Sequence, residues 1–180
     1  MPQIVDTPIV DHQTSIASNL VTRAGDALTI REASRADVKQ LGEIYAHLTA
    51  QDMRFRFRGG IEKLGSEDLN TLVDRAAGMT SYLAFSGETP VACATLIRDP
   101  GQNTAEVILS VRPDWKGRGV SWSLLGDVLA RAEAAGLSRV SSVELGEDCE
   151  AINLQREMGF VARLKCVEPL EFTMVKALGR

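Results

Sequence analysis

The sequence has few of the residues that build metal sites and disulfide frameworks. Its 180 residues include three widely spaced cysteines, with no CxxC pair, and two histidines. We therefore expect neither a disulfide-stapled fold nor a bound metal, and the cysteine usage favours a reducing compartment. No apolar run has the length of a membrane span, and no basic-then-apolar secretory signal opens the chain. These absences predict a cytoplasmic protein.

An excess of positive charge is also missing. The net charge of −4 and the pI of about 5.3 do not favour a nucleic-acid-binding surface. Arginines alternate with phenylalanines over Arg54–Arg58, and we expect that segment to line a cleft or form an edge strand instead. The hydrophobic share of 44% and the charged share of 24% are ordinary for a globular domain. The chain is long enough for one core.

The hydrophobic pattern divides the chain into a short arm and one domain. Residues 1–26 show no sustained period and are predicted to form an N-terminal arm, either loosely ordered or docked on the rest, and residues 27–180 form the domain. Ser34 and Ser66 are the predicted N-caps of the first two helices. Strands are expected over 28–31, 81–86, 90–98, 104–111, 139–145, 160–167 and 171–177, and further helices over 119–135 and 148–158. This order predicts a mixed sheet with helices on its faces.

The segment after the strand over 104–111 carries the chemical signal. A short loop with Gly117 and Gly119 leads directly into a long helix, and Lys116 and Arg118 flank the glycines. Free N–H groups at a helix N-terminus, reached through glycines, favour anions and predict a phosphate or pyrophosphate site. The spacing matches neither a Walker loop nor a dinucleotide fingerprint. The alternative is a tight turn in which the glycines only make the corner.

This loop resembles the acyl-CoA signature of GNAT N-acetyltransferases, Q/R-x-x-G-x-G/A. The stretch Val111-Arg-Pro-Asp-Trp-Lys-Gly-Arg-Gly-Val-Ser places Lys116, Gly119 and Ser121 at the three fixed positions, and Gly159-Phe160 is similar to the end of a later motif. The resemblance implies an α/β (α+β) GNAT fold with a mixed, mostly antiparallel sheet of about six or seven strands and about four flanking helices. It also implies acetyl-CoA as co-substrate.

The stretch from His47 to Arg58, Leu64-Gly-Ser-Glu-Asp-Leu and Thr104-Ala-Glu-Val resemble the acetyltransferase domain of Pat-type bacterial protein lysine acetyltransferases. The resemblance implies acetyl transfer to a primary amine, with a protein lysine as one acceptor. A small amine is a second possible acceptor. A third hypothesis is a binding protein that senses acyl-CoA without turnover. We expect no nucleic-acid or membrane partner, and the N-terminal arm suggests a homodimer.

The family resemblance assigns a set of donor-binding residues. Three of them depart from the family pattern: Ser121 stands for a Gly or Ala, Asp148 for an Asn that contacts CoA, and Lys116 for a Gln or Arg. Gln155 stands where many members have a tyrosine acid. The donor-binding set is Leu109, Ser110, Val111, Lys116, Gly117, Arg118, Gly119, Val120, Ser121 and Asp148.

Acetyl transfer to an amine needs a base, an oxyanion donor and a proton for the departing thiolate. Glu106 is the predicted base, by its match to the Pat-type Ala-Glu motif, and it should share a strand face with Ile108 and Ser110. The alternative for Glu106 is a solvent-facing carboxylate. A backbone N–H around Leu109–Val111 is the expected oxyanion donor. No acid is evident: Ser110, Ser123 and Cys149 are candidates, and so is solvent.

Overall fold

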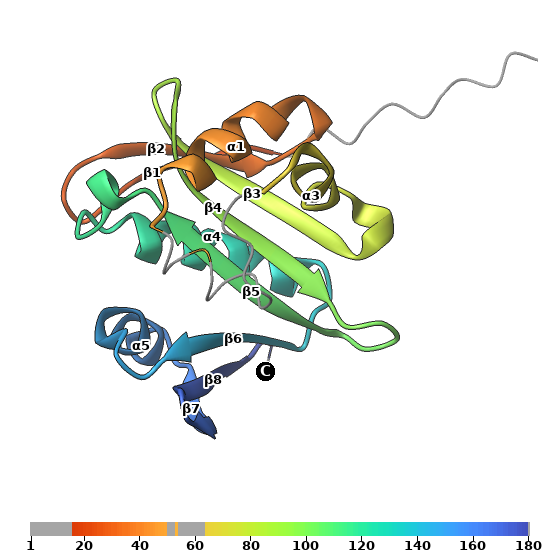
Figure 1. The fold of residues 1–180 in the computed structure, drawn as a ribbon, viewed down its shortest axis with the longest axis vertical. Coiled ribbons are helices and arrows are strands. Elements are labelled where there is room, and N and C mark those ends of the chain that lie inside the picture. The colour runs from red at the N-terminus through yellow and green to blue at the C-terminus, as the bar shows by residue number, and fades with distance from the viewer. Residues whose placement is uncertain (1–15, 50–52, 54–63, 180) are drawn as a thin grey trace, which may run out of the picture.

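The computed structural model describes residues 16–49, 53 and 64–179. These residues form an eight-stranded sheet with helices on both faces (Figure 1). The strand order is β1-β2-β3-β4-β5-β6-β8-β7, and all neighbours are antiparallel except β5 and β6. The α+β fold with a mixed, mostly antiparallel sheet is therefore confirmed. The strands are β1 Ser18–Val21, β2 Ala27–Glu32, β3 Met79–Ser86, β4 Thr89–Arg98, β5 Thr104–Val111, β6 Arg139–Leu145, β7 Val161–Val167 and β8 Leu170–Ala177.

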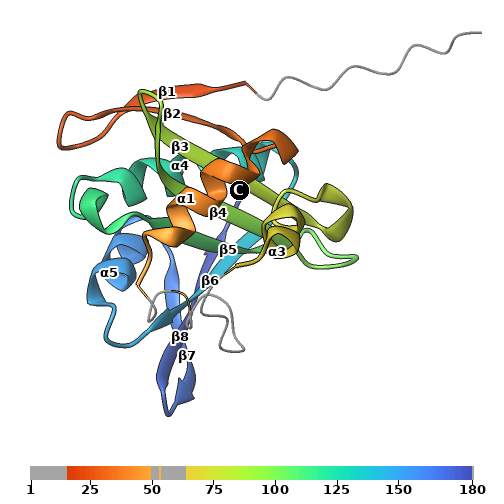
Figure 2. The same ribbon diagram turned by 45° about the horizontal axis from the view of Figure 1, so that its top comes forward.

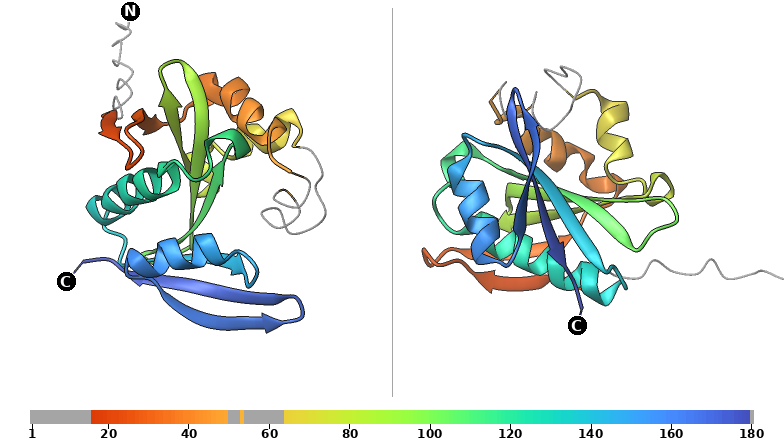
Figure 3. Two further views of the ribbon diagram at one scale, coloured as in Figure 1. Left: turned by 90° about the vertical axis from the view of Figure 1, so that its left-hand side faces the viewer. Right: turned by 90° about the horizontal axis from the view of Figure 1, so that it is seen from below.

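Helices α1 and α3 lie on one face of the sheet, and α4 and α5 lie on the other (Figures 2 and 3). Alternation along β3 shows why both faces are apolar. Tyr82 and Ala84 belong to the core under α4, and Leu83 and Phe85 belong to the core under α1. The helices are α1 Val38–Ala46, α3 Ser66–Thr71, α4 Val120–Ala134 and α5 Cys149–Glu157.

Strand β1 is the element that the sequence pattern did not predict. Residues 18–21 pair antiparallel with β2, so this part of the predicted arm docks on the body as an edge strand. It raises the number of strands in the described residues to eight, above the expected six or seven. Residues 1–15 lie outside the described residues. The signal that could have revealed the strand is the turn sequence Thr22-Arg-Ala-Gly-Asp26, which separates β1 from β2.

The predicted capping of the first helix is confirmed and that of the second is shifted by one residue. Ser34 accepts a hydrogen bond from the Ala36 N–H at 3.3 Å, and Asp37 accepts one from the Ser34 N–H at 2.8 Å. A short 3-10 turn, Arg35–Asp37, precedes α1. The N-cap of α3 is Gly65 and not Ser66, because Asp68 accepts from the Gly65 N–H at 2.8 Å.

Asp37 holds β2 and α1 together through Arg31. Two guanidinium N–H groups of Arg31 donate to the Asp37 carboxylate at 2.9 Å and 2.6 Å. This hydrogen-bonded arginine, together with the N–H of Ser34, lowers the pKa of Asp37 from 3.8 to about 2. The side chain of Asp37 is buried, so solvent screens the pair weakly.

Replacing Asp37 by Asn is expected to lower the free energy of unfolding at pH 7 by about 2 kcal/mol. A carboxyl whose pKa is lowered on folding contributes its stabilisation above its unfolded-state pKa and loses it as the pH falls through the folded-state value. The difference between wild type and Asp37→Asn should therefore shrink between about pH 4 and pH 2. Urea unfolding across this range measures it, and a difference that stays constant with pH contradicts the assignment.

Candidate donor and catalytic site

The backbone of β5 is exposed on one edge because its pairing with β6 stops early. The two strands pair only from Thr104↔Arg139 to Glu106↔Ser141. Beyond Glu106 the pairing ends, and Figure 1 shows the ribbons of β5 and β6 diverging. Beyond this point, among the described residues, β5 has a strand neighbour only on its β4 side.

The hydrogen bonds at both ends of the β4–β5 ladder show which residues face the open edge. The Arg112 N–H donates to the Val91 carbonyl at 3.0 Å, and the Asp99 N–H donates to the Thr104 carbonyl at 3.0 Å. In an antiparallel pair, peptide groups alternate between the two sides. Even-numbered residues of β5 therefore direct their peptide groups to β4. Val107, Leu109 and Val111 direct theirs to the open edge, as expected for an oxyanion donor around Leu109–Val111.

Ser110 lies on the opposite side of this strand. Its peptide groups face β4, and its side chain is completely buried beside Cys93, on the α1 face. The hydroxyl has no hydrogen-bond partner among the described residues. This placement argues against a role for Ser110 in donor binding or as the acid, because neither its backbone nor its hydroxyl reaches the open edge.

Glu106 stands where the two strands separate. It is half-buried on the α1 face, together with Ile108 and Ser110, as the strand alternation predicts. Its neighbour across the last rung is Ser141. No hydrogen bond or ion pair of Glu106 occurs among the residues that the structure describes. A half-buried carboxylate at the mouth of the divergence fits a base better than it fits a solvent-facing surface residue.

The loop from β5 to α4 has the geometry of an anion site. A 3-10 turn, Pro113–Trp115, follows β5, and Gly117 and Gly119 take φ angles of 74° and 80°. Gly119 is the N-cap of α4, and the first helical hydrogen bond runs from the Ser123 N–H to its carbonyl at 3.1 Å. The N–H groups of Val120, Ser121 and Trp122 precede that bond and have no partner within the helix. Their dipoles favour a negative charge at this corner.

Gly117 and Gly119 have different surroundings. A Cβ added at Gly117 would have no neighbour within 4 Å among the described residues, so the surface there is open to a ligand. A Cβ at Gly119 would lie 3.2 Å from the backbone nitrogen of Arg23. The close approach that requires glycine at position 119 is therefore made by the turn between β1 and β2. An open, glycine-lined corner with free N–H groups fits the diphosphate of an acyl-CoA.

Arg118 is held by an acid that sequence analysis placed in the arm. Its Nε–H donates to Asp26 at 3.0 Å, its second guanidinium nitrogen pairs with the other carboxylate oxygen, and its guanidinium stacks 3.9 Å from the Trp115 ring centre. Its charge is thus balanced by Asp26. Arg118 fixes the loop to the β1–β2 turn, while Lys116 is exposed on the loop. Trp115 packs against the core.

Helix α5 contributes a cap and a buried polar bridge. Asp148 is its N-cap and accepts from the Ala151 N–H at 3.2 Å, and Cys149 beside it is exposed. Gln155 is buried, accepts from the Ser142 hydroxyl at 2.6 Å and donates to Glu144 at 2.5 Å. An amide cannot act as an acid, so Gln155 joins α5 to β6 instead of supplying a proton.

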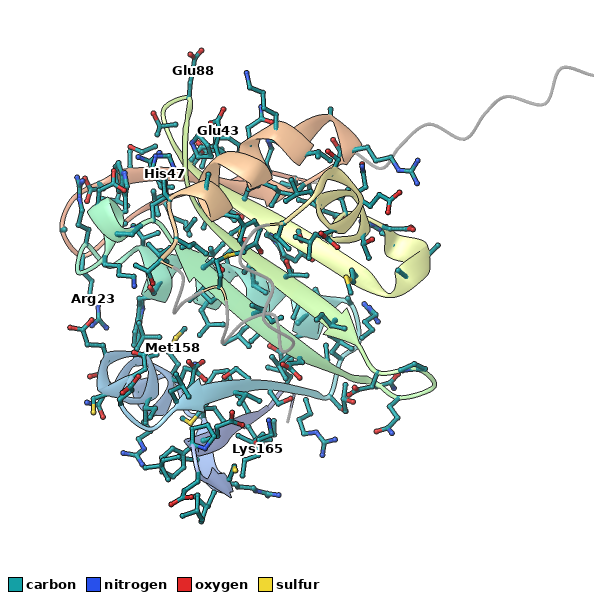
Figure 4. The ribbon with its side chains drawn as sticks, in the orientation of Figure 1. Arg23, Glu43, His47, Glu88, Met158 and Lys165 are labelled. Atoms are coloured by element: carbon teal, nitrogen blue, oxygen red, sulfur yellow. The ribbon has the colours of Figure 1, made fainter. Side chains whose placement is uncertain are left out.

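Two further segments named in the sequence analysis lie outside this corner. Arg54–Arg58 falls outside the described residues. His47 is exposed at the end of α1, where its Nδ1 lies 2.6 Å from the Glu43 carbonyl (Figure 4).

Within the described ranges, no group of three or more His, Cys, Asp or Glu side chains could hold a metal ion. None of the described helices is both long and apolar enough to cross a membrane.

The divergent parallel strands and the glycine-lined helix N-terminus together have a geometry that suits an acyl-CoA donor. The family model of the acetyltransferase (GNAT) family matches residues 44–160. The chain belongs to this family, and it is thereby an acetyltransferase, which confirms the expectation drawn from the loop signature.

Solved structures with this fold include a GNAT domain and two N-acetyltransferases. The GNAT domain of S. lividans PAT superposes with a TM-score of 0.80 at 20% identity, covering 90% of this chain and 97% of that one. The PaiA N-acetyltransferase from Thermoplasma acidophilum, in complex with coenzyme A, gives 0.68 at 18% identity, with 83% and 98% covered. Spermidine N-acetyltransferase from Vibrio cholerae, in complex with CoA and spermine, gives 0.69 at 16% identity, with 83% and 95% covered.

Two glycine substitutions separate backbone strain from the close approach at the loop. Gly119 and Gly136 both have a φ of 80°, but a Cβ at Gly136 would have no neighbour within 4 Å in the described chain. Alanine at either position is expected to cost about 1–2 kcal/mol of stability. Only Gly119→Ala should also weaken acetyl-CoA binding, by roughly tenfold, because it displaces the loop. Calorimetric titration and urea unfolding measure both effects, and equal binding by the two variants contradicts the assignment.

Replacement of Gln155 by Leu tests whether α5 supplies an acid. The substitution leaves the Ser142 hydroxyl and Glu144 without their amide partner, so the free energy of unfolding should fall by about 2–3 kcal/mol. The kcat of the folded variant should change far less than the roughly 10²- to 10⁴-fold that loss of a general acid causes. A large loss of kcat with stability unchanged would reverse this interpretation.

Proposed function

We propose that this chain transfers an acetyl group from acetyl-CoA to a primary amine, and that the acceptor is a protein lysine. The observation that carries the proposal is the end of the β5–β6 ladder at Glu106. It leaves the peptide groups of Leu109 and Val111 on an edge that has no strand neighbour among the described residues, beside the N-terminus of α4. A thioester bound along that edge would lie near three groups: the peptide N–H donors of β5, the anion site at the N-terminus of α4 and the carboxylate of Glu106.

The donor is held mainly by backbone groups in this proposal. The diphosphate would bind at the corner formed by Gly117, Gly119 and the first N–H groups of α4, with Lys116 beside it. Ser121 is the second residue of α4, and its small half-buried side chain leaves its N–H available. Asp148 caps α5 through its side chain, so any contact it makes with the donor comes in addition to that cap. Bound acetyl-CoA supplies the activated acetyl group as a thioester.

Glu106 receives the proton of the incoming amine. A lysine ammonium is not a nucleophile until it loses a proton, and a half-buried carboxylate at the divergence is placed to accept it directly or through one water. The N–H groups of Leu109 and Val111 face the same edge and donate to the oxygen on which negative charge develops. Since Ser110 is closed off and Gln155 is an amide, the remaining sources of a proton for the thiolate are solvent, Ser123 and the exposed Cys149.

The protein lysine acceptor is supported by the likeness to S. lividans PAT and by the Ala-Glu motif at Ala105 and Glu106. The acidic chain, with a net charge of −4, suits a basic partner. A small polyamine is the second candidate, supported by the similar fold of the V. cholerae spermidine enzyme. An acyl-CoA sensor is the third, favoured by Ser121, Asp148 and Gln155.

The setting of the activity is part of the same proposal. We infer a domain of residues 27–180 that β1 completes, working in the cytoplasm, where the three free cysteines would stay reduced. A homodimer would cover exposed apolar side chains on the outer strand β7, at Val161, Leu164 and Val167.

The matched variants Glu106→Gln and Glu88→Gln test the proposal. Glu88 points into solvent from the β3–β4 turn (Figure 4). Loss of the base should lower kcat by roughly 10²- to 10⁴-fold in Glu106→Gln and leave the Kd for acetyl-CoA unchanged. Release of CoA against lysine-bearing proteins and a polyamine panel is the measurement. Full activity in Glu106→Gln removes the base assignment, and saturable acetyl-CoA binding without turnover on any acceptor favours the sensor.

A further inference from the structure

We propose that Arg23, in the turn between β1 and β2, binds the ribose 3′-phosphate of the acyl-CoA donor. This inference rests on the proposed function in one respect, that the donor is a CoA thioester. Such a donor carries three phosphate groups, of which two form the diphosphate. The third is a separate dianion on the ribose, and an arginine is a suitable partner for it.

The turn that carries Arg23 is fixed by its own hydrogen bonds. The Thr22 N–H donates to the Asp26 carbonyl at 2.8 Å, the Gly25 N–H donates to the Thr22 carbonyl at 2.9 Å, and the Asp26 N–H donates to the Thr22 hydroxyl at 3.1 Å. Thr22 is buried. The backbone at Arg23 is therefore held in one place.

This turn contacts the loop from β5 to α4, called the phosphate loop below, at two places. Asp26 pairs with Arg118 on the loop, and the backbone nitrogen of Arg23 would lie 3.2 Å from a Cβ at Gly119. The guanidinium of Arg23 then lies over the Trp122 ring, 4.0 Å from its centre. Trp122 is the third residue of α4, so the cation stands beside the first turn of that helix.

Arg23 has a weaker carboxylate partner than the neighbouring arginines. Asp26 balances Arg118, and Asp114 accepts two hydrogen bonds from Arg112 at 3.1 Å and 2.8 Å. Arg23 approaches Glu157 only to 3.8 Å, and these two side chains are 66% and 63% exposed. An exposed pair of this kind contributes little and can be exchanged for a phosphate.

Stacking on Trp122 prepares the guanidinium for such an exchange. The ring contact uses the flat face of the cation and leaves its in-plane N–H groups to donate. The planar fork suits a phosphate dianion, which it can bind through two oxygens. Stacking also reduces the side-chain entropy lost on binding.

The position of Arg23 favours the 3′-phosphate over the diphosphate. N–H groups at a helix N-terminus point along the helix axis, so the diphosphate belongs over the end of α4. Arg23 lies beside the helix and extends from the β1–β2 turn toward α5 (Figure 4). A group that it reaches is therefore off that axis, as the separate ribose phosphate is.

Binding of CoA and of 3′-dephospho-CoA, each measured by calorimetric titration, tests the proposal. The wild-type chain is expected to bind CoA more tightly than 3′-dephospho-CoA. Arg23→Gln should weaken CoA binding by roughly tenfold and leave 3′-dephospho-CoA within about twofold, because the second ligand lacks the group that Arg23 binds. Arg163→Gln, an exposed arginine on β7, is the matched control and should bind both ligands as wild type does.

A second variant gives a change in the opposite direction. Glu157→Gln removes the carboxylate that competes with the phosphate, so it should tighten CoA binding by about twofold to threefold and leave 3′-dephospho-CoA unchanged. If Arg23→Gln weakens the binding of CoA and of 3′-dephospho-CoA equally, Arg23 binds the diphosphate and the proposal is overturned. Unchanged binding of both ligands also overturns it. A wild-type chain that binds neither ligand overturns the proposed function itself, and with it this inference.

Discussion

The proposed donor site depends on one interrupted ladder of backbone hydrogen bonds. Strands β5 and β6 pair over three rungs and then separate, although each has residues left to pair. Exposed peptide groups of this kind are costly to bury without partners and ready to pair with an extended molecule. The pantetheine arm of CoA carries amide groups and has the extended shape that such an edge accepts. In the proposed function, the interruption is what makes this sheet edge a binding surface.

The separation of the two strands is held from both sides. β6 is paired with β8 along its whole length, from Arg139↔Ala177 to Leu145↔Glu171, and β8 with β7, so β6 can approach β5 further only if this hairpin moves with it. On the other side, α4 packs its buried face against the sheet with Leu124, Leu125 and Val128. Gln155 links β6 to α5 through Ser142 and Glu144. The position that family resemblance associates with an acid is used here to keep a strand in place.

Much of the fold could be predicted from the sequence because its local signals agree with its tertiary contacts. The strand at 104–111 and that at 139–145 have the predicted bounds, since clear alternation and turn residues delimit them. Gly119 and Gly136 mark the two ends of α4, where φ is positive. The β1 strand was missed because four residues at a sheet edge, with half their side chains exposed, carry almost no period.

The site was predicted less completely, for a physical reason. Glycines and a helix start are local features, whereas Asp26 and Arg23 reach the loop across about ninety positions of sequence, and no periodicity encodes that contact. The family resemblance placed Ser110 at the donor together with Leu109 and Val111. Strand alternation turns it to the other face, where it is closed off.

The edge strand β1 and the turn after it are tied to α4 and to the loop before it at two separate points. Arg131 donates to the Ile16 carbonyl at 2.8 Å and to the Ser18 hydroxyl at 2.9 Å, and Asp26 holds Arg118 at the far end of the helix. By linkage, a donor that steadies the phosphate loop also stabilises this strand against local opening. Local opening of β1 and binding of the donor are therefore coupled. Amide protons of β1 would exchange more slowly with solvent when the donor is bound.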